Sequence, residues 1–79
     1  MQDKIQPYLN KLLEFIQRKR INSNISLDEL EKKCNEAGLK IKSGTLSKIE
    51  KGEVIPNTDT LFTILHALDC KIEIDNKYL

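Results

Sequence analysis

Aromatic residues and long apolar runs are scarce in this 79-residue chain. Only four residues are aromatic, two tyrosines and two phenylalanines, although hydrophobic residues make up 39% of the sequence. A core built from this inventory consists mainly of Leu and Ile, and the length suits one small domain over residues 1–79. No apolar run approaches membrane-spanning length and no signal peptide opens the chain. We therefore expect a cytoplasmic protein without membrane contact.

Cysteine and histidine are too few to suggest a metal centre or a disulfide framework. Cys34 and Cys70 lie far apart without a Cys-x-x-Cys motif, and each occupies an apolar position of its segment. We therefore predict two buried free thiols in a reducing cytosol. The single histidine, His66, cannot complete a metal site with them, and we expect it at the surface or half-buried on a helix. Because no activated nucleophile or phosphate-binding glycine loop is recognisable either, we predict no enzymatic activity, no metal and no cofactor.

The charged residues nearly balance, with a net charge of +1, but they are unevenly distributed. Residues 38–52 hold four lysines against one glutamate, whereas residues 53–75 hold five acidic residues against one lysine, and residues 18–20 form another basic run. A DNA backbone responds to a local basic face rather than to the net charge. A solvated surface is the commoner explanation of such a pattern, so charge alone does not establish a partner.

Apolar residues at three- and four-residue spacing predict helices. The predicted helices cover residues 7–20, 27–37, 43–51 and 58–68. Pro7 suits a first helical turn, and Ser26 with Glu29 forms a capping box for the second helix. Gly38 and Gly52 are expected to end the second and third helices. The predicted fold class is thus all-α, a compact domain of four or five helices.

The spacing of apolar residues changes to two after Asp69. Cys70, Ile72 and Ile74 alternate with charged residues, which predicts a short strand over residues 70–75. We expect this strand to have no partner within its own sequence. Its partner is then the same strand of a second copy, and Cys70, Ile72 and Ile74 are predicted to form the contact of a homodimer.

The third predicted helix has only two apolar residues, Leu46 and Ile49, and therefore buries little. A helix with a polar outer side that follows another helix after a turn is the helix-turn-helix pattern, in which the second helix enters the DNA major groove. The segment TLSKIEKGEVIPNTDTLFTILHALD, residues 45–69, resembles the Xre (Cro/repressor) helix-turn-helix family. Residues 19–21 and 26–30 resemble the end of its first helix and the start of its second. The resemblance implies a dimeric repressor that binds double-stranded DNA at a palindromic operator.

The resemblance also assigns individual DNA contacts. The seven positions are Lys42, Ser43, Gly44, Thr45, Ser47, Lys48 and Lys51. It places Lys42 and Lys51 at phosphates and Thr45 at a phosphate or a base methyl group, and it places the other four at base edges. Serine and threonine hydrogen-bond to any base edge and discriminate weakly, whereas Lys48 can prefer guanine.

The connection between the second and third helices is longer than the family usually has. Leu30 and Leu46 are 16 positions apart in the sequence. We predict that the second helix is extended by about one turn and that the turn after it is expanded. Cys34 and Ala37 share the spacing of the buried residues before them, so both are expected on the buried side.

Three further positions depart from the family pattern. Leu27 stands where the family usually has a phosphate-contacting Gln, and Glu31 stands where it has a small residue, usually Ala. The family pairs the glutamate at position 50 with an arginine of the first helix. The matching position here is Phe15, which leaves the partner of Glu50 open.

The ending CKIEI, residues 70–74, resembles HipB-like antitoxin-repressors, whose terminal strands pair across the dimer. This resemblance implies a repressor that regulates its own toxin–antitoxin operon, with a kinase-like toxin as a second candidate partner. A phage or plasmid repressor is an alternative. A protein-interaction module that neutralises a toxin and binds DNA weakly is another, favoured by the modest basic charge and by Leu27.

Overall fold

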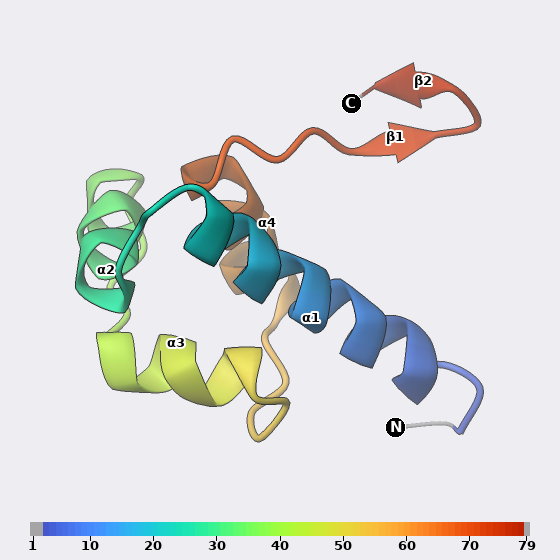
Figure 1. Ribbon diagram of the computed structural model, residues 1–79, viewed down its shortest axis with the longest axis horizontal. Coiled ribbons are helices and arrows are strands. Elements are labelled where there is room, and N and C mark those ends of the chain that lie inside the picture. The colour runs from blue at the N-terminus through green and yellow to red at the C-terminus, as the bar shows by residue number, and fades with distance from the viewer. Residues whose placement is uncertain (1–2, 79) are drawn as a thin grey trace.

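The computed structural model describes residues 3–78, which form four helices followed by a two-stranded β-hairpin (Figure 1). The elements are α1 (Gln6–Asn22), α2 (Leu27–Glu36), α3 (Ser43–Glu50), α4 (Thr58–Ala67), β1 (Glu73–Ile74) and β2 (Lys77–Tyr78). The four-helix alternative is therefore confirmed over these residues, and every helix begins and ends within two residues of its predicted range. None of these helices has both the length and the apolar character that a membrane crossing requires.

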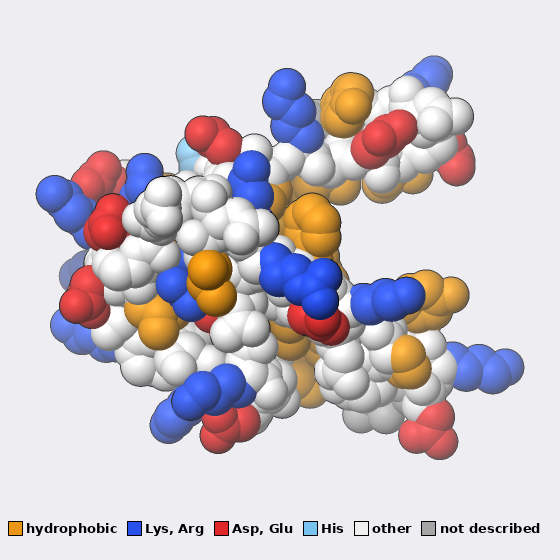
Figure 2. All heavy atoms as spheres, in the orientation of Figure 1, with side chains coloured by type: hydrophobic (Ala, Val, Ile, Leu, Met, Phe, Trp, Pro, Cys, Tyr) orange, Lys and Arg blue, Asp and Glu red, His pale blue; other side chains and the backbone are white. Residues whose placement is uncertain are grey.

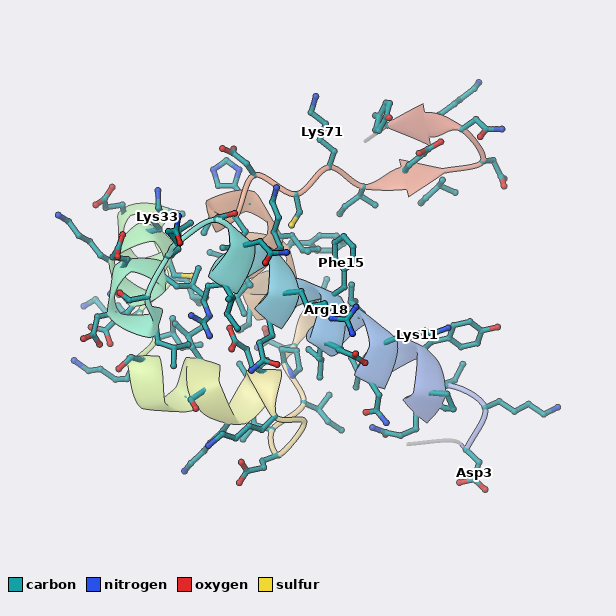
Figure 3. The ribbon with its side chains drawn as sticks, viewed as in Figure 1. Asp3, Lys11, Phe15, Arg18, Lys33 and Lys71 are labelled. Atoms are coloured by element: carbon teal, nitrogen blue, oxygen red, sulfur yellow. The ribbon has the colours of Figure 1, made fainter. Side chains whose placement is uncertain are left out.

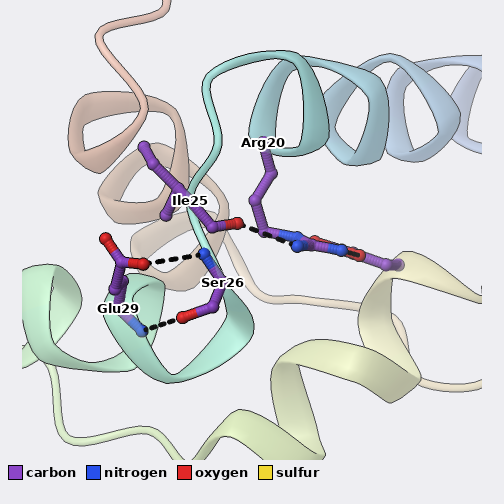
Figure 4. A network of polar contacts seen from close by, with 5 residues as sticks. Arg20, Ile25, Ser26 and Glu29 are labelled. Atoms are coloured by element: carbon purple, nitrogen blue, oxygen red, sulfur yellow. Dashed lines mark hydrogen bonds and ion pairs between the residues drawn. The ribbon is translucent and has the colours of Figure 1, made fainter.

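Local capping accounts for where the helices start and stop. The capping box of α2 is present: the Glu29 N–H donates to the Ser26 hydroxyl at 3.0 Å, and the Ser26 N–H donates to the Glu29 carboxylate at 3.3 Å (Figure 4). In α4, the Asn57 side chain accepts from the Thr60 N–H at 2.8 Å. Such caps contribute about 1 kcal/mol each, so short polar sequence signals set two of the helix starts.

The core is aliphatic, as the composition predicts. The buried hydrophobic residues of the described chain come from all four helices: Leu13, Ile16, Leu30, Cys34, Leu46, Ile49, Ile64, Leu65 and Leu68. None of these side chains is aromatic. Contacts join α1 to α3, and join α2 to both α3 and α4, so α3 is held from two sides.

The connection between α2 and α3 is a loop over residues 37–42, because α2 ends at Glu36, one residue before its predicted end. The prediction that Ala37 lies on the buried side is wrong, because α2 ends at Glu36 and Ala37 is exposed. Gly38 adopts a φ of +99°, which glycine tolerates and which turns the chain back toward the core. The Leu39 N–H then donates to the Cys34 carbonyl at 2.9 Å. Leu39 and Ile41 pack against the core, so the longer connection is still partly buried.

The C-terminal segment contradicts the prediction of a strand without a partner in its own chain. Only Glu73–Ile74 is extended as β1, and it pairs antiparallel with Lys77–Tyr78. Asp75 and Asn76 form the turn with φ values of +51° and +66°, the geometry of a tight two-residue hairpin. The predicted strand also extended too far toward the N-terminus, because Cys70 and Ile72 lie in the coil before β1 and pack against the core.

Candidate nucleic-acid interface

One side of α3 lies in the core and the other faces outward at the edge of the helical body (Figure 1). Leu46 and Ile49 attach the helix, with exposed fractions of 1% and 2%. Burial of two such side chains contributes roughly 1.5–3 kcal/mol each. Apart from these two residues, only Glu50 of α3 is buried. The outward side of α3 therefore consists of residues that the fold does not need for packing.

The seven residues assigned to DNA contact all lie on α3 or on the residue that flanks each of its ends. Lys42, Gly44, Thr45, Lys48 and Lys51 are exposed. The two serines at positions 43 and 47 are half-buried, because they lie at the border between the exposed side and the buried side. The structure thus brings the seven positions onto one helix, with the lysines and Thr45 more accessible than the serines.

Arg20 is the partner of Glu50. The Arg20 Nε donates to Glu50 Oε2 at 2.7 Å and its Nη2 donates to Oε1 at 3.0 Å, which makes the pair bidentate. A third bond runs from Arg20 Nη1 to the Ile25 carbonyl at 2.9 Å (Figure 4). The two side chains are 12% and 4% exposed. This cluster joins the end of α1, the loop before α2 and the last residue of α3.

Sequence reasoning missed this arginine, although a signal was present. Arg20 follows the buried residues Leu13 and Ile16 at helical spacing, so it lies on the same side of α1 as the core residues. Phe15, which matched the family position, is 61% exposed instead. The buried side of α1 was therefore a better guide to the partner of Glu50 than the alignment of family positions.

The pairing of Glu50 changes the charge that the surrounding segment presents outward. Glu50 is the acidic residue of the segment 38–52, and it faces Arg20 inside the fold. The four lysines of that segment, at positions 40, 42, 48 and 51, are all exposed. Figure 2 shows both basic and acidic side chains around α3. Glu53, three residues after the end of α3, is exposed as well. The outward side of α3 is therefore basic, but only moderately so.

The start of α3 is capped from another helix. Lys42 occupies the N-cap position of α3. Its side chain makes no capping hydrogen bond to this helix, which lies wholly within the described residues. Instead, Glu31 of α2 accepts a hydrogen bond from the Ser43 N–H at 2.6 Å. Nothing local in the sequence indicates this contact, because the two residues are twelve positions apart.

Leu27 packs inward rather than toward a ligand. It is half-buried against the core at the first position of α2. It stands where the family resemblance expects a phosphate-contacting side chain. This position therefore strengthens the core and offers no polar group to DNA.

The residues predicted for dimerisation do not share one strand. Cys70 and Ile72 are half-buried against the core, whereas Ile74 in β1 is 57% exposed. The register pairs Ile74 with Lys77, and Lys71 lies over the Tyr78 ring with its Nζ 5.9 Å from the centroid. The hairpin extends beyond the helical body on the far side of α1 from α3 (Figure 1).

The two cysteines are free, and only Cys34 is fully buried. Burial raises the pKa of the Cys34 thiol. Burial also raises the pKa of Cys70, with the nearby Lys19 charge acting in the opposite direction. Both groups are therefore held as neutral thiols near pH 7, and His66 is exposed as expected.

The arrangement of α2 and α3 agrees with the result of a comparison with protein families. A family model described as helix-turn-helix matches residues 16–74, which include the C-terminal part of α1, all of α2, α3 and α4, and β1. A search of curated proteins and a search of solved structures gave no match. Because the family match covers well over half of the chain, the chain belongs to the Xre-type helix-turn-helix family of DNA-binding regulators, whose domains are generally not enzymes.

Proposed function

We propose that this protein is a dimeric transcriptional repressor that inserts α3 into the DNA major groove at a palindromic operator. The observation that carries the proposal is the division of α3 into two sides. Leu46, Ile49 and Glu50 hold the helix in the fold, and its exposed positions carry lysines, Thr45 and a glycine. A helix held in this way presents polar side chains to a groove without disturbing the core.

In this proposal the exposed residues take different roles. Lys48 donates to a guanine edge, while Lys42 and Lys51 neutralise phosphates at the two ends of the helix. Thr45 contacts a phosphate or a base methyl group. The half-buried Ser43 and Ser47 contribute weaker base contacts at the border of the exposed side, and Gly44 lets the backbone approach the DNA.

We propose that the homodimer forms where the hairpin meets α1. Two-residue strands that are exposed throughout form only a marginally stable hairpin by themselves. Figure 2 shows a notch between the hairpin and α1 with hydrophobic side chains along it, and Figure 3 shows Phe15 on the side of α1 toward the hairpin. A second copy would cover Phe15 and Ile74 there, continuous with the half-buried Cys70 and Ile72. Pairing on this side leaves the outward side of α3 free.

Charge supports a second copy as the occupant of this surface. The hairpin carries Glu73 and Asp75 against Lys77, and Lys11 lies one helical turn before Phe15 on α1, whereas Arg18 already pairs with Glu14 (Figure 3). A two-fold arrangement would bring Glu73 and Asp75 of each copy to Lys11 of the other. Sedimentation of the Ile74→Asp variant tests this: it should be monomeric where the wild type is dimeric, and a dimer of unchanged strength would move the interface elsewhere.

The proposed biological setting is autoregulation of a toxin–antitoxin operon by a HipB-like cytoplasmic antitoxin. The support is the family to which the chain belongs and the sequence ending CKIEI, although Glu73 and Ile74 of this ending pair with residues 77–78 of the same chain. A phage or plasmid repressor remains an alternative with the same DNA contacts. The other alternative, a module that neutralises a kinase-like toxin and binds DNA weakly, is favoured by the exposed side chains of Tyr8, Phe15 and Tyr78 and by the inward packing of Leu27.

Selection from a pool of random duplex DNA tests the proposal directly. The wild-type protein should enrich a palindrome whose half-sites lie about one helical turn apart, roughly 34–36 Å. Its affinity for that duplex should fall steeply as salt rises, because several phosphates are neutralised. Failure to enrich any sequence, together with a shallow salt dependence, would instead support the protein-interaction module.

A further inference from the structure

We infer that Glu31 is a positioning residue for α3 in DNA recognition. Its carboxylate caps the first turn of α3 from α2 and thereby sets the angle at which α3 meets the groove. The inference rests on the proposed function of α3. It goes beyond the family resemblance, in which this position holds a small residue that cannot make such a contact.

The chemistry of the contact favours a strong bond. Glu31 Oε1 accepts from the Ser43 N–H at 2.6 Å, a short distance for a hydrogen bond to an ionised carboxylate. The acceptor lies at the positive end of the α3 dipole, where a negative charge is stabilised. Glu31 is half-buried, so water competes less for its carboxylate than at an open surface.

The contact has no substitute within the described residues. Ser26 caps α2 and Asn57 caps α4 from within their own segments, whereas Lys42 at the start of α3 offers no acceptor side chain. Among the side-chain hydrogen bonds of residues 3–78, the bond from Ser43 to Glu31 is the one that joins α2 to α3. Without it, the connection over residues 37–42 would be held mainly by the packing of Leu39 and Ile41.

Glu31 and Arg20 hold opposite ends of the same helix. Arg20 binds Glu50, the last residue of α3, and Glu31 binds Ser43, the first. Leu46 and Ile49 lie between these two ends. Their apolar contacts oppose separation of α3 from the core more than they oppose a change in the direction of its axis. Two polar contacts at the two ends define the direction of the helix axis, and base readout depends on this direction because Lys48 must reach one base edge.

The carboxylate also disfavours one mode of DNA binding. The free N–H groups at a helix start are a common site for DNA phosphate. Here the Ser43 N–H is occupied by a negatively charged acceptor, which repels a phosphate at this helix start and favours phosphate contacts with lysine side chains such as Lys42. Loss of Glu31 should therefore weaken selective binding without weakening nonspecific binding.

The test compares Glu31→Ala, Glu31→Gln and Glu36→Ala in the full chain. Glu31→Ala removes both the acceptor and the charge, and Glu31→Gln keeps an acceptor oxygen but removes the charge. Glu36→Ala is the matched control, because Glu36 is an exposed acidic residue of the same helix, at its last position. Each variant is measured for amide exchange at Ser43, and for affinity to the duplex that the wild type selects and to a shuffled duplex.

Glu31→Ala should speed exchange at Ser43 by about tenfold or more relative to α4, the scale of a lost hydrogen bond to a charged group. Its affinity for the selected duplex should fall by about tenfold, while its affinity for the shuffled duplex stays equal or rises. Glu31→Gln should give intermediate values for the Ser43 protection and for the ratio between the two duplexes, because it keeps an acceptor oxygen but loses the charge. Glu36→Ala should leave that ratio unchanged.

An unchanged ratio in Glu31→Ala would overturn the inference, as would a Glu31→Gln variant that behaves like Glu31→Ala in both measurements. The exchange measurement does not depend on DNA. If the wild type selects no duplex, the proposed function fails, whereas unchanged Ser43 exchange in Glu31→Ala refutes the cap itself. The two failures are therefore distinguishable.

Discussion

α3 and the C-terminal hairpin are both short, but they are held in opposite ways. α3 has eight residues, of which Leu46, Ile49 and Glu50 are buried. The hairpin has two strands of two residues, all of them exposed, and its own contacts are the β1–β2 pairing and the position of Lys71 over Tyr78. The comparison shows that a short helix in a small domain keeps one orientation when side chains far away in the sequence contact it. In our proposal the hairpin gains further contacts only in the homodimer, whereas the orientation of α3 is already fixed in the monomer before DNA binds.

The largest expected effect comes from breaking the polar contact at the end of α3. Arg20→Ala leaves Glu50 buried without its partner, which should lower the free energy of unfolding by about 3–5 kcal/mol. Urea denaturation measures the change. Arg18→Ala is the matched control, because its pair with Glu14 lies at the surface and should contribute about 1 kcal/mol or less. Equal losses in the two variants would refute the special role of the buried pair.

Truncation of the lysines on α3 should have the next largest effect, on DNA binding rather than on folding. Lys48→Ala should weaken binding to the selected duplex by about 1–3 kcal/mol and relax its preference at one base pair. Lys42→Ala and Lys51→Ala should weaken binding to all duplexes alike and reduce the salt slope by about 1. Titration at several salt concentrations measures both effects. Lys33→Ala on α2 is the control, because Lys33 is exposed and belongs to neither α3 nor the hairpin. The assigned surface is wrong if this variant weakens binding as much as Lys48→Ala.

A smaller change at Gly44 separates stability from recognition. Apart from its chain neighbours and the backbone of its own helix, no atom of the described residues lies within 4 Å of the position that a Cβ would occupy there, and the residue is in a helix. Gly44→Ala should therefore raise the free energy of unfolding by about 0.5–1 kcal/mol. If the backbone approaches DNA at this residue, the same variant should bind the selected duplex less tightly. Thermal unfolding measures the stability of the variant, and titration with duplex DNA measures its affinity. Unchanged affinity would mean that Gly44 does not lie in the interface with DNA.

Removal of the hairpin should have the smallest effect on the stability of the monomer. Residues 73–78 are exposed, whereas Cys70 and Ile72 before them pack against the core. A chain that ends after Ile72 should therefore lose less than about 0.5 kcal/mol of monomer stability, and it should sediment as a monomer. A chain that ends after Asp69 is the informative comparison, because it also loses the packing of Cys70 and Ile72 and should be clearly less stable. A large loss already on cutting after Ile72 would contradict the contrast between α3 and the hairpin.

Local patterns in the sequence were enough for the helices, their caps and the aliphatic core. The apolar spacing of α1 and α4, the Ser26–Glu29 box and the glycine after α2 each act over a few residues. The hairpin was missed because strands of two residues are too short to show alternation, and Asp75–Asn76 is a weaker turn signal than a pair containing glycine.

The contacts that hold α3 could not be predicted in the same way. Arg20 and Glu50 are thirty positions apart, and Glu31 and Ser43 are twelve apart. Such pairs depend on how whole helices pack. The helical spacing of α1 indicates that Arg20 faces the core, but no short motif identifies its partner or the partner of Glu31. Among the positions of the candidate site, the exposure of the lysines and Thr45 was predictable from helical spacing, but the half-burial of Ser43 and Ser47 was not.

The division of α3 into two sides has an evolutionary consequence. The residues that stabilise the helix, Leu46, Ile49 and Glu50, are separate from the exposed residues such as Thr45 and Lys48. Substitutions at exposed helix positions usually change stability by less than about 0.5 kcal/mol. A descendant of this protein could therefore acquire a different target sequence through single substitutions on the outward side of α3. Each variant along this evolutionary path would still fold.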